Sequence, residues 1–182
     1  DWAYAERPAM AVLDGNASAD EREALAEDIL VYDGRAPQQV GMIWAPEGLN
    51  PDAYLEALAH MRAAIPAHES IPGTLQMQRA FLKAQDAPHA YPEDLTFLFS
   101  KGAPEIKNGL HVRWASYEAL GDVKSWIEEH PDAVGTVLCR SGQIDRVRET
   151  TEGARSTKLL GTLHRADWFR PCQSDLMRSP HR

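Results

Sequence analysis

Residues 110–163 read LHVRWASYEALGDVKSWIEEHPDAVGTVLCRSGQIDRVRETTEGARSTKLLGTL, and this stretch decides the predicted fold. Apolar and polar residues alternate over 110–114, which is typical of a strand with one polar face. A helical pattern follows over 116–130, and β-branched and apolar residues over 133–140 predict a second strand. The order strand, helix, strand indicates a domain that mixes both kinds of element.

The second part of this stretch is predicted to form further strands. The sequence SGQ at 141–143 is typical of a tight turn, so 144–150 is expected to return as an antiparallel strand. Ile144 and Val147 are three residues apart and cannot share one face of a regular strand, so a bulge or an edge position is expected there. A last strand is expected over 159–163.

Three helices are predicted in the first half of the chain. Ser18 and Glu21 form the capping box of a helix over 19–30. Asn50 and Pro51 are good starting residues for a helix over 51–65, and a third helix is expected over 74–85. Apolar runs predict further strands over 10–13, 39–44 and 95–99.

The predicted sheet is mixed and mainly antiparallel. The aromatic-rich run over 95–99 is apolar on both faces, which places it near the middle of the sheet. The strand over 110–114 is expected to return beside it as an antiparallel neighbour. The sequence therefore predicts an α+β fold, as a single domain over 1–182 with five to seven strands, about four helices packed mainly on one face, and a frayed tail over 174–182.

The composition excludes some classes of protein. The chain has 19 Lys and Arg against 27 Asp and Glu, a formal net charge of −8, and this disfavours general nucleic-acid binding, which needs a cationic surface. No apolar run approaches the roughly 20 residues that span a bilayer, and the N-terminal residues do not resemble a signal peptide. A soluble, cytoplasmic protein is expected, with Cys139 and Cys172 reduced and Cys139 serving as a packing residue.

The chain contains no local catalytic signature: no Walker loop, no His-Glu-x-x-His, no Gly-x-Ser-x-Gly and no Cys-x-x-Cys. This absence and the negative charge predict an acidic binding or accessory protein, such as an inhibitor, an immunity protein or a regulatory subunit. It would need no cofactor, and its partner would be another protein. The candidate binding residues combine the residue types of interaction hot spots: Arg146, Arg148, Arg165, Trp168 and Phe169. These residues have an alternative interpretation, in which the arginines lie on a solvated face of the sheet and the aromatic residues belong to a C-terminal lid packed over it.

A second hypothesis is a small metal- or histidine-dependent enzyme or small-molecule binder that uses the sheet over 110–165. His111, Glu149 and His164 come from three predicted strands and are residue types that hold a divalent metal. The element order over 110–163 also resembles one βαβββ module of the vicinal-oxygen-chelate superfamily, which implies a metal on such strands. This resemblance covers under a third of the chain and extends to element order alone.

Overall fold

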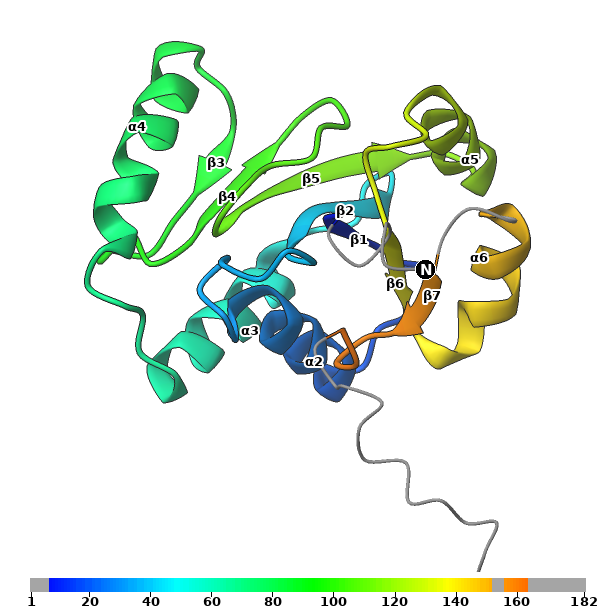
Figure 1. Ribbon diagram of the computed structural model, residues 1–182, viewed down its shortest axis with the longest axis horizontal. Helices are drawn as coiled ribbons and strands as arrows, with labels where there is room; N and C mark the ends of the chain where they lie inside the picture. Colours follow the sequence, from blue (N-terminus) through cyan, green and yellow to red (C-terminus); the bar gives the residue numbers. More distant parts are fainter. Residues whose placement is uncertain (1–6, 152–155, 164–182) are drawn as a thin grey trace, which may run out of the picture.

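A computed structural model describes residues 7–151 and 156–163, and its centre is one seven-stranded sheet (Figure 1). The strand order is β3-β4-β5-β2-β1-β6-β7. Every neighbouring pair is parallel except β3 with β4. The strands are β1 (Ala9–Val12), β2 (Val40–Pro46), β3 (His89–Ala90), β4 (Leu98–Lys101), β5 (His111–Tyr117), β6 (Thr136–Cys139) and β7 (Ser156–Leu159).

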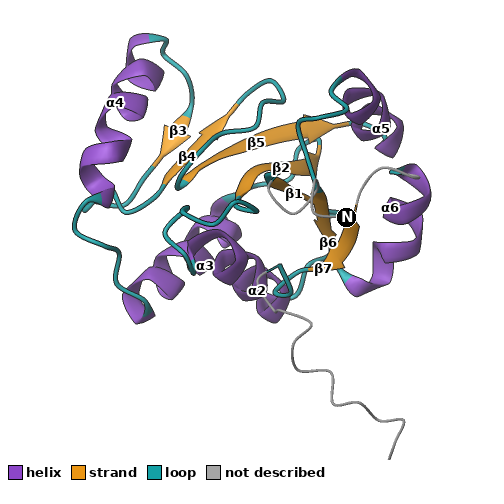
Figure 2. Cartoon of the chain, viewed as in Figure 1, coloured by secondary structure: helices purple, strands orange, loops and turns teal. Residues whose placement is uncertain are grey.

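Helices cover both faces of the sheet (Figure 2). One face carries α2 (Ala19–Leu30) and α3 (Asp52–Ala64). The other carries α4 (Ile71–Ala84) at one end of the sheet, and α5 (Leu120–Glu129) and α6 (Ile144–Thr150) at the other end. A short 3₁₀ turn, Ser141–Gln143, leads into α6.

Two apolar cores follow from this arrangement, because successive side chains of a strand point to opposite faces. In β1, Ala9 and Ala11 belong to the core that contains α2 and α3 and that also includes the buried residues of α4. Met10 and Val12 belong to the core that contains α5 and α6. The strand is fully buried on both sides, as parallel strands between two helical layers usually are.

The predicted helices of the first half are confirmed, and local capping explains their starts. Ser18 Oγ accepts a hydrogen bond from the Glu21 N–H, and the Glu21 carboxylate accepts one from the Ser18 N–H. The helix that follows has the predicted bounds. The predicted helix over 74–85 begins earlier, at Ile71, since Pro72 in its first turn needs no hydrogen-bond partner.

The prediction of a mainly antiparallel α+β sheet is wrong. Leu98 pairs with His111 and Lys101 with Trp114 in a parallel register, so β5 is not a returning neighbour of β4. The connection over 102–110 carries the chain back across the sheet before β5 begins. With helices on both faces, the described residues form a doubly wound α/β fold.

The predicted antiparallel hairpin after residue 140 is also wrong. Residues 144–150 form α6, in which Ile144 and Val147, three apart, lie on the side of the helix that packs on the sheet. That spacing is helical, so no bulge is needed. Ser156–Leu159 then pairs with β6 in parallel. The order β5, α5, β6, α6, β7 therefore differs from the βαβββ module that the sequence resembled.

None of the helices within 7–151 and 156–163 is long and apolar enough to cross a membrane. The interpretation of residues 1–182 as a single domain with a frayed tail stays a prediction, because 164–182 lie outside the described residues.

Candidate functional site

Three polar side chains interrupt the buried parallel strands β4 and β5. Ser100 is 0% exposed, His111 3% and Arg113 9%. Strands that are covered on both faces are normally apolar throughout, so buried polar residues at these positions need a specific reason. The register aligns Ser100 with Arg113 and Leu98 with His111, so the three side chains share one face of the sheet.

His111 is held by hydrogen bonds on both ring nitrogens. Nδ1 lies 2.7 Å from Gln78 Oε1 of α4, which can only accept, so the Nδ1–H donates. Nε2 lies 2.7 Å from Ser100 Oγ and accepts a hydrogen bond from that hydroxyl. Burial lowers the pKa of His111 to about 4, and the Lys107 and Arg113 cations act in the same direction. The imidazole is therefore neutral near pH 7.

We expect this histidine to make stability depend on pH between about 4 and 6.5. In that window the unfolded histidine binds a proton and the folded one does not, so the free energy of unfolding rises with pH, by up to about 1.4 kcal/mol per pH unit. Urea unfolding of wild type and His111→Gln across this range measures the difference. An NMR titration of His111 with its midpoint near 6.5 would contradict the prediction.

The connection between β4 and β5 lies over the same face, between two hollows. The Lys107 N–H donates to Gly41 O of β2 at 3.1 Å. A Cβ at position 41 would lie 2.3 Å from Lys107 O, so only glycine permits this close approach. Pro104 of the connection lines one hollow, whereas Glu105 and Lys107 line the other.

The first hollow, of about 320 Å³, lies between this connection and α4, and we call it the α4 hollow. His111 and Arg113 line it from β5. The Glu105 carboxylate contacts Lys107 Nζ at 2.5 Å and Arg113 Nη2 at 3.3 Å. The hydrogen bond from Lys107 is the main reason that the pKa of Glu105 is lowered. Two cations and one carboxylate thus line the α4 hollow.

The second hollow, of about 490 Å³, lies at the carboxyl ends of β2 and β5, and we call it the carboxyl-edge hollow. Ala45 pairs with Ser116 and Pro46 with Tyr117 there, so the two strands end side by side. Trp44, 2% exposed, lines the hollow, and its Nε1 has no hydrogen-bond partner among the described residues. The charged residues of the lining are all acidic: Glu47, Glu118 and Asp122.

The point where the chain changes direction across the sheet lies between β1 and β6, and β1 separates it from the β2–β5 pair that lines the carboxyl-edge hollow. Ligands of doubly wound folds bind outside the carboxyl ends of the strands, and the hollow lies at that edge of the sheet. The Tyr117 hydroxyl donates to Leu13 O at the end of β1. Asp14 accepts a hydrogen bond from Arg140 Nη1 at 2.9 Å, and Glu21 Oε2 lies 3.4 Å from Arg140 Nε. Burial opposes ionisation of Asp14, but the Asn16 N–H and Arg140 outweigh it and lower its pKa.

The helices that begin at this edge disfavour a phosphate ligand. A helix N-terminus attracts phosphate through its unpaired N–H groups and its dipole. Here α2, α3, α5 and α6 each follow a parallel strand and carry an acidic residue in the first turn: Asp20, Glu21, Asp52, Asp122 and Asp145. A pyrophosphate at this edge would therefore meet negative charge.

The structure separates the described members of the proposed metal set. His111 lies on β5, whereas Glu149 lies on α6, which packs beside β7. Four strand-to-strand steps separate β5 from β7, or about 19 Å at a spacing of ~4.8 Å. No group of three metal-binding side chains occurs within 7–151 and 156–163. His164 lies outside the described residues, so the full set stays a prediction.

Arg146 and Arg148 do not share the face of a strand, as was predicted, because they lie on a helix. Arg146 and Arg148 lie on α6, where residues two apart point in different directions. Arg148 is solvent-exposed and lies 3.6 Å from Asp145 of its own helix. The other predicted binding residues, Arg165, Trp168 and Phe169, lie outside the described residues.

The sequence interpretation missed the residues that hold His111 and Arg113. Gln78, Ser100 and Glu105 carry no local signature, and their partners lie 8 to 33 residues away in the sequence. Only the shared polar face of His111 and Arg113 was visible, as an alternation in an otherwise apolar strand. Cys139, which is 0% exposed, is confirmed as a packing residue, and burial raises the pKa of its thiol to about 11.

No family model matches the sequence, and no curated protein sequence matches it. Solved structures with a similar fold include several dehydrogenases. A NAD-dependent benzaldehyde dehydrogenase from Corynebacterium glutamicum aligns with a TM-score of 0.56 and 14% identity over 84% of this chain and 38% of its own. Delta-pyrroline-5-carboxylate dehydrogenase from Mycobacterium tuberculosis aligns with a TM-score of 0.60 and 13% identity over 85% of this chain and 34% of its own.

Proline utilization A from Bradyrhizobium japonicum aligns with a TM-score of 0.59 and 13% identity, over 83% of this chain and 18% of its own. The chain thus spans well under half the length of these proteins, and at these identities the likeness concerns the fold. It corrects the leading functional prediction. An inhibitor, immunity protein or regulatory subunit was the wrong expectation, because the solved structures that share this fold over part of their length are dehydrogenases, one of them NAD-dependent.

Proposed function

We propose that this chain is part of an oxidoreductase of the aldehyde-dehydrogenase kind, and that it holds the aldehyde and not the dinucleotide. The fold of the similar structures supports the class of enzyme. The observation that carries the proposal is the carboxyl-edge hollow at the carboxyl ends of the parallel strands β2 and β5, the edge at which ligands of such folds bind.

The chemistry of the carboxyl-edge hollow favours an uncharged carbonyl compound. Ser116 offers a hydroxyl donor, and Trp44 adds an indole wall. Glu47, Glu118 and Asp122 repel anions, so a neutral aldehyde is accepted more readily than a carboxylate. The same charges favour release of an acid once it has formed.

The acidic first turns of the helices at this edge are the reason that we assign the dinucleotide elsewhere. The aligned dehydrogenases are much longer than the region shared with this chain. The remaining length of such a protein would supply the pyrophosphate site. A protein partner and a cytoplasmic location stay predictions that no observation supports.

Binding measurements test this assignment. We expect benzaldehyde to shift the backbone NMR signals of Ser116 and Tyr117 in a saturable way, and NAD⁺ to leave the first turn of α2 unshifted. Ser116→Ala should weaken benzaldehyde binding about two- to tenfold, the usual effect of one neutral hydrogen bond. Ser125→Ala, on the exposed side of α5, serves as the matched control. Saturable NAD⁺ binding at α2, or equal effects of the two serine variants, would overturn the proposal.

A further inference from the structure

The α4 hollow has features that the proposed function does not use. It lies between the connection over 102–110 and α4, whereas the carboxyl-edge hollow lies on the other side of that connection. Two polar side chains of its lining, His111 and Arg113, are each at least nine-tenths buried. A hollow of about 320 Å³ is within the size range of small-molecule sites.

Arg113 is incompletely paired for a buried guanidinium. Its Nη2 contacts Glu105 at 3.3 Å, but its buried Nε has no hydrogen-bond partner among the described residues. A Cβ at position 102 would lie 2.5 Å from Nη1, so Gly102 provides the space that this cation occupies. Burying a cation with unused donors is costly unless an anion reaches it.

The charge of the α4 hollow is opposite to that of the chain as a whole. Among the described residues that line the hollow, Glu105 alone balances Lys107 and Arg113, because the buried His111 imidazole is neutral. The hollow therefore carries a local excess of positive charge in a protein of net charge −8. Glu105 also demonstrates that these two cations accept one carboxylate between them.

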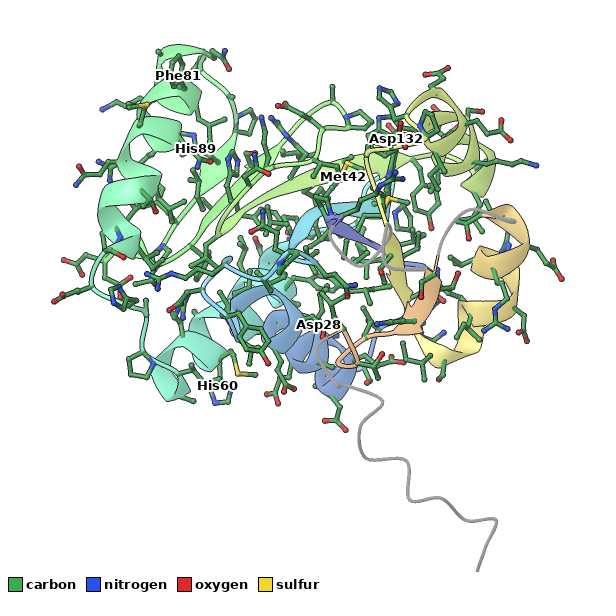
Figure 3. The ribbon with its side chains drawn as sticks, in the orientation of Figure 1. Asp28, Met42, His60, Phe81, His89 and Asp132 are labelled. Atoms are coloured by element: carbon green, nitrogen blue, oxygen red, sulfur yellow. The ribbon has the colours of Figure 1, made fainter. Side chains whose placement is uncertain are left out.

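The opposite wall of the α4 hollow is apolar. Phe81 and Leu82 of α4 line it, and Phe81 is 63% exposed. Figure 3 shows Phe81 on the upper part of α4. An exposed phenylalanine beside a cationic pair is suited to a ligand with one charged end and one apolar body.

We propose that the α4 hollow binds a small monocarboxylic acid, whose carboxylate contacts Arg113 and Lys107 and whose apolar body packs on Phe81. Glu105 occupies the cations when no ligand is bound and competes with it. This site is separate from the aldehyde position and does not depend on the proposed function.

Calorimetric titration of the chain with benzoate tests this site. We expect saturable binding that Lys107→Met and Arg113→Met each weaken about tenfold or more, as expected for a lost charged hydrogen bond. Glu105→Gln should instead tighten benzoate binding about tenfold, because it removes the competing carboxylate. Lys83→Met, a lysine in the last turn of α4 that does not line the hollow, is the matched control.

Two other probes separate the alternatives. Benzyl alcohol, which has the same ring without the charge, should bind at least about tenfold more weakly than benzoate. Inorganic phosphate should bind more weakly too, since it gains nothing from Phe81. Thermal melts test whether each variant is folded. If Arg113→Met does not fold, the affinities of Lys107→Met and Glu105→Gln for benzoate test the proposal. Tighter binding of phosphate or benzyl alcohol, or no gain in Glu105→Gln, would sink the proposal.

Discussion

Replacing Trp114 by alanine is expected to destabilise the protein by about 3–5 kcal/mol, the usual cost of removing a large buried aromatic side chain. Trp114 is 0% exposed and lies in β5. Its ring centroid is 5.4 Å from that of Tyr54 on α3 and 5.6 Å from that of Phe99 on β4. The substitution therefore opens a cavity where three elements meet.

Urea unfolding followed by circular dichroism measures this loss for Trp114→Ala. Trp126→Ala is the matched control, because Trp126 on α5 is only half-buried and packs against Trp44 and the exposed His130. We expect the control to lose less than half as much stability. Equal losses would show that Trp114 is not the centre of this core.

Replacing Asp28 by alanine is expected to cost about 2–5 kcal/mol, because it leaves two buried backbone N–H groups without their acceptor. Asp28 is a carboxylate of α2 that is 3% exposed (Figure 3). It accepts hydrogen bonds from the Gly161 N–H at 2.6 Å and the Leu163 N–H at 3.1 Å. These bonds attach the segment after β7 to the helix.

Amide hydrogen exchange reports this attachment directly. In Asp28→Ala, exchange at Gly161 and Leu163 should accelerate more than exchange in β1, since the local contact opens before the sheet does. Asp20→Ala, an exposed substitution in the first turn of the same helix, should change stability by less than about 1 kcal/mol. A variant Asp28→Ala that unfolds at the same urea concentration as Asp20→Ala would contradict this role.

The helices were predictable because their signals are local. Ser18 with Glu21 at one helix start, and Asn50, which accepts a hydrogen bond from the Asp52 N–H, at another, fix where a helix begins through contacts within one turn. The direction of strands is not local. The same apolar pattern in 98–101 and 111–117 fits a parallel or an antiparallel pair, and only the helices on the second face decide between them.

The error at 144–150 had a visible cause. The sequence SGQ at 141–143 suggested a hairpin turn and a returning strand, but it forms a 3₁₀ turn that leads into α6, and Ile144 and Val147 already had a helical spacing. For the site, the shared face of His111 and Arg113 was predictable from alternation. Their partners were not, because Gln78 reaches His111 from α4 and Glu105 reaches Arg113 from the connection over 102–110, and both contacts form only when these segments pack on the sheet.

The position of β1 has a consequence for how the chain assembles during synthesis. Met10 pairs with Met42 on one side and with Val137 on the other. The edge of β1 that pairs with β2 is filled soon after β1 leaves the ribosome. The edge that pairs with β6 stays open until almost all of the described chain has been synthesised. Until then a fully apolar strand edge is open to wrong pairing, so we expect the nascent chain to depend on chaperones until β6 emerges.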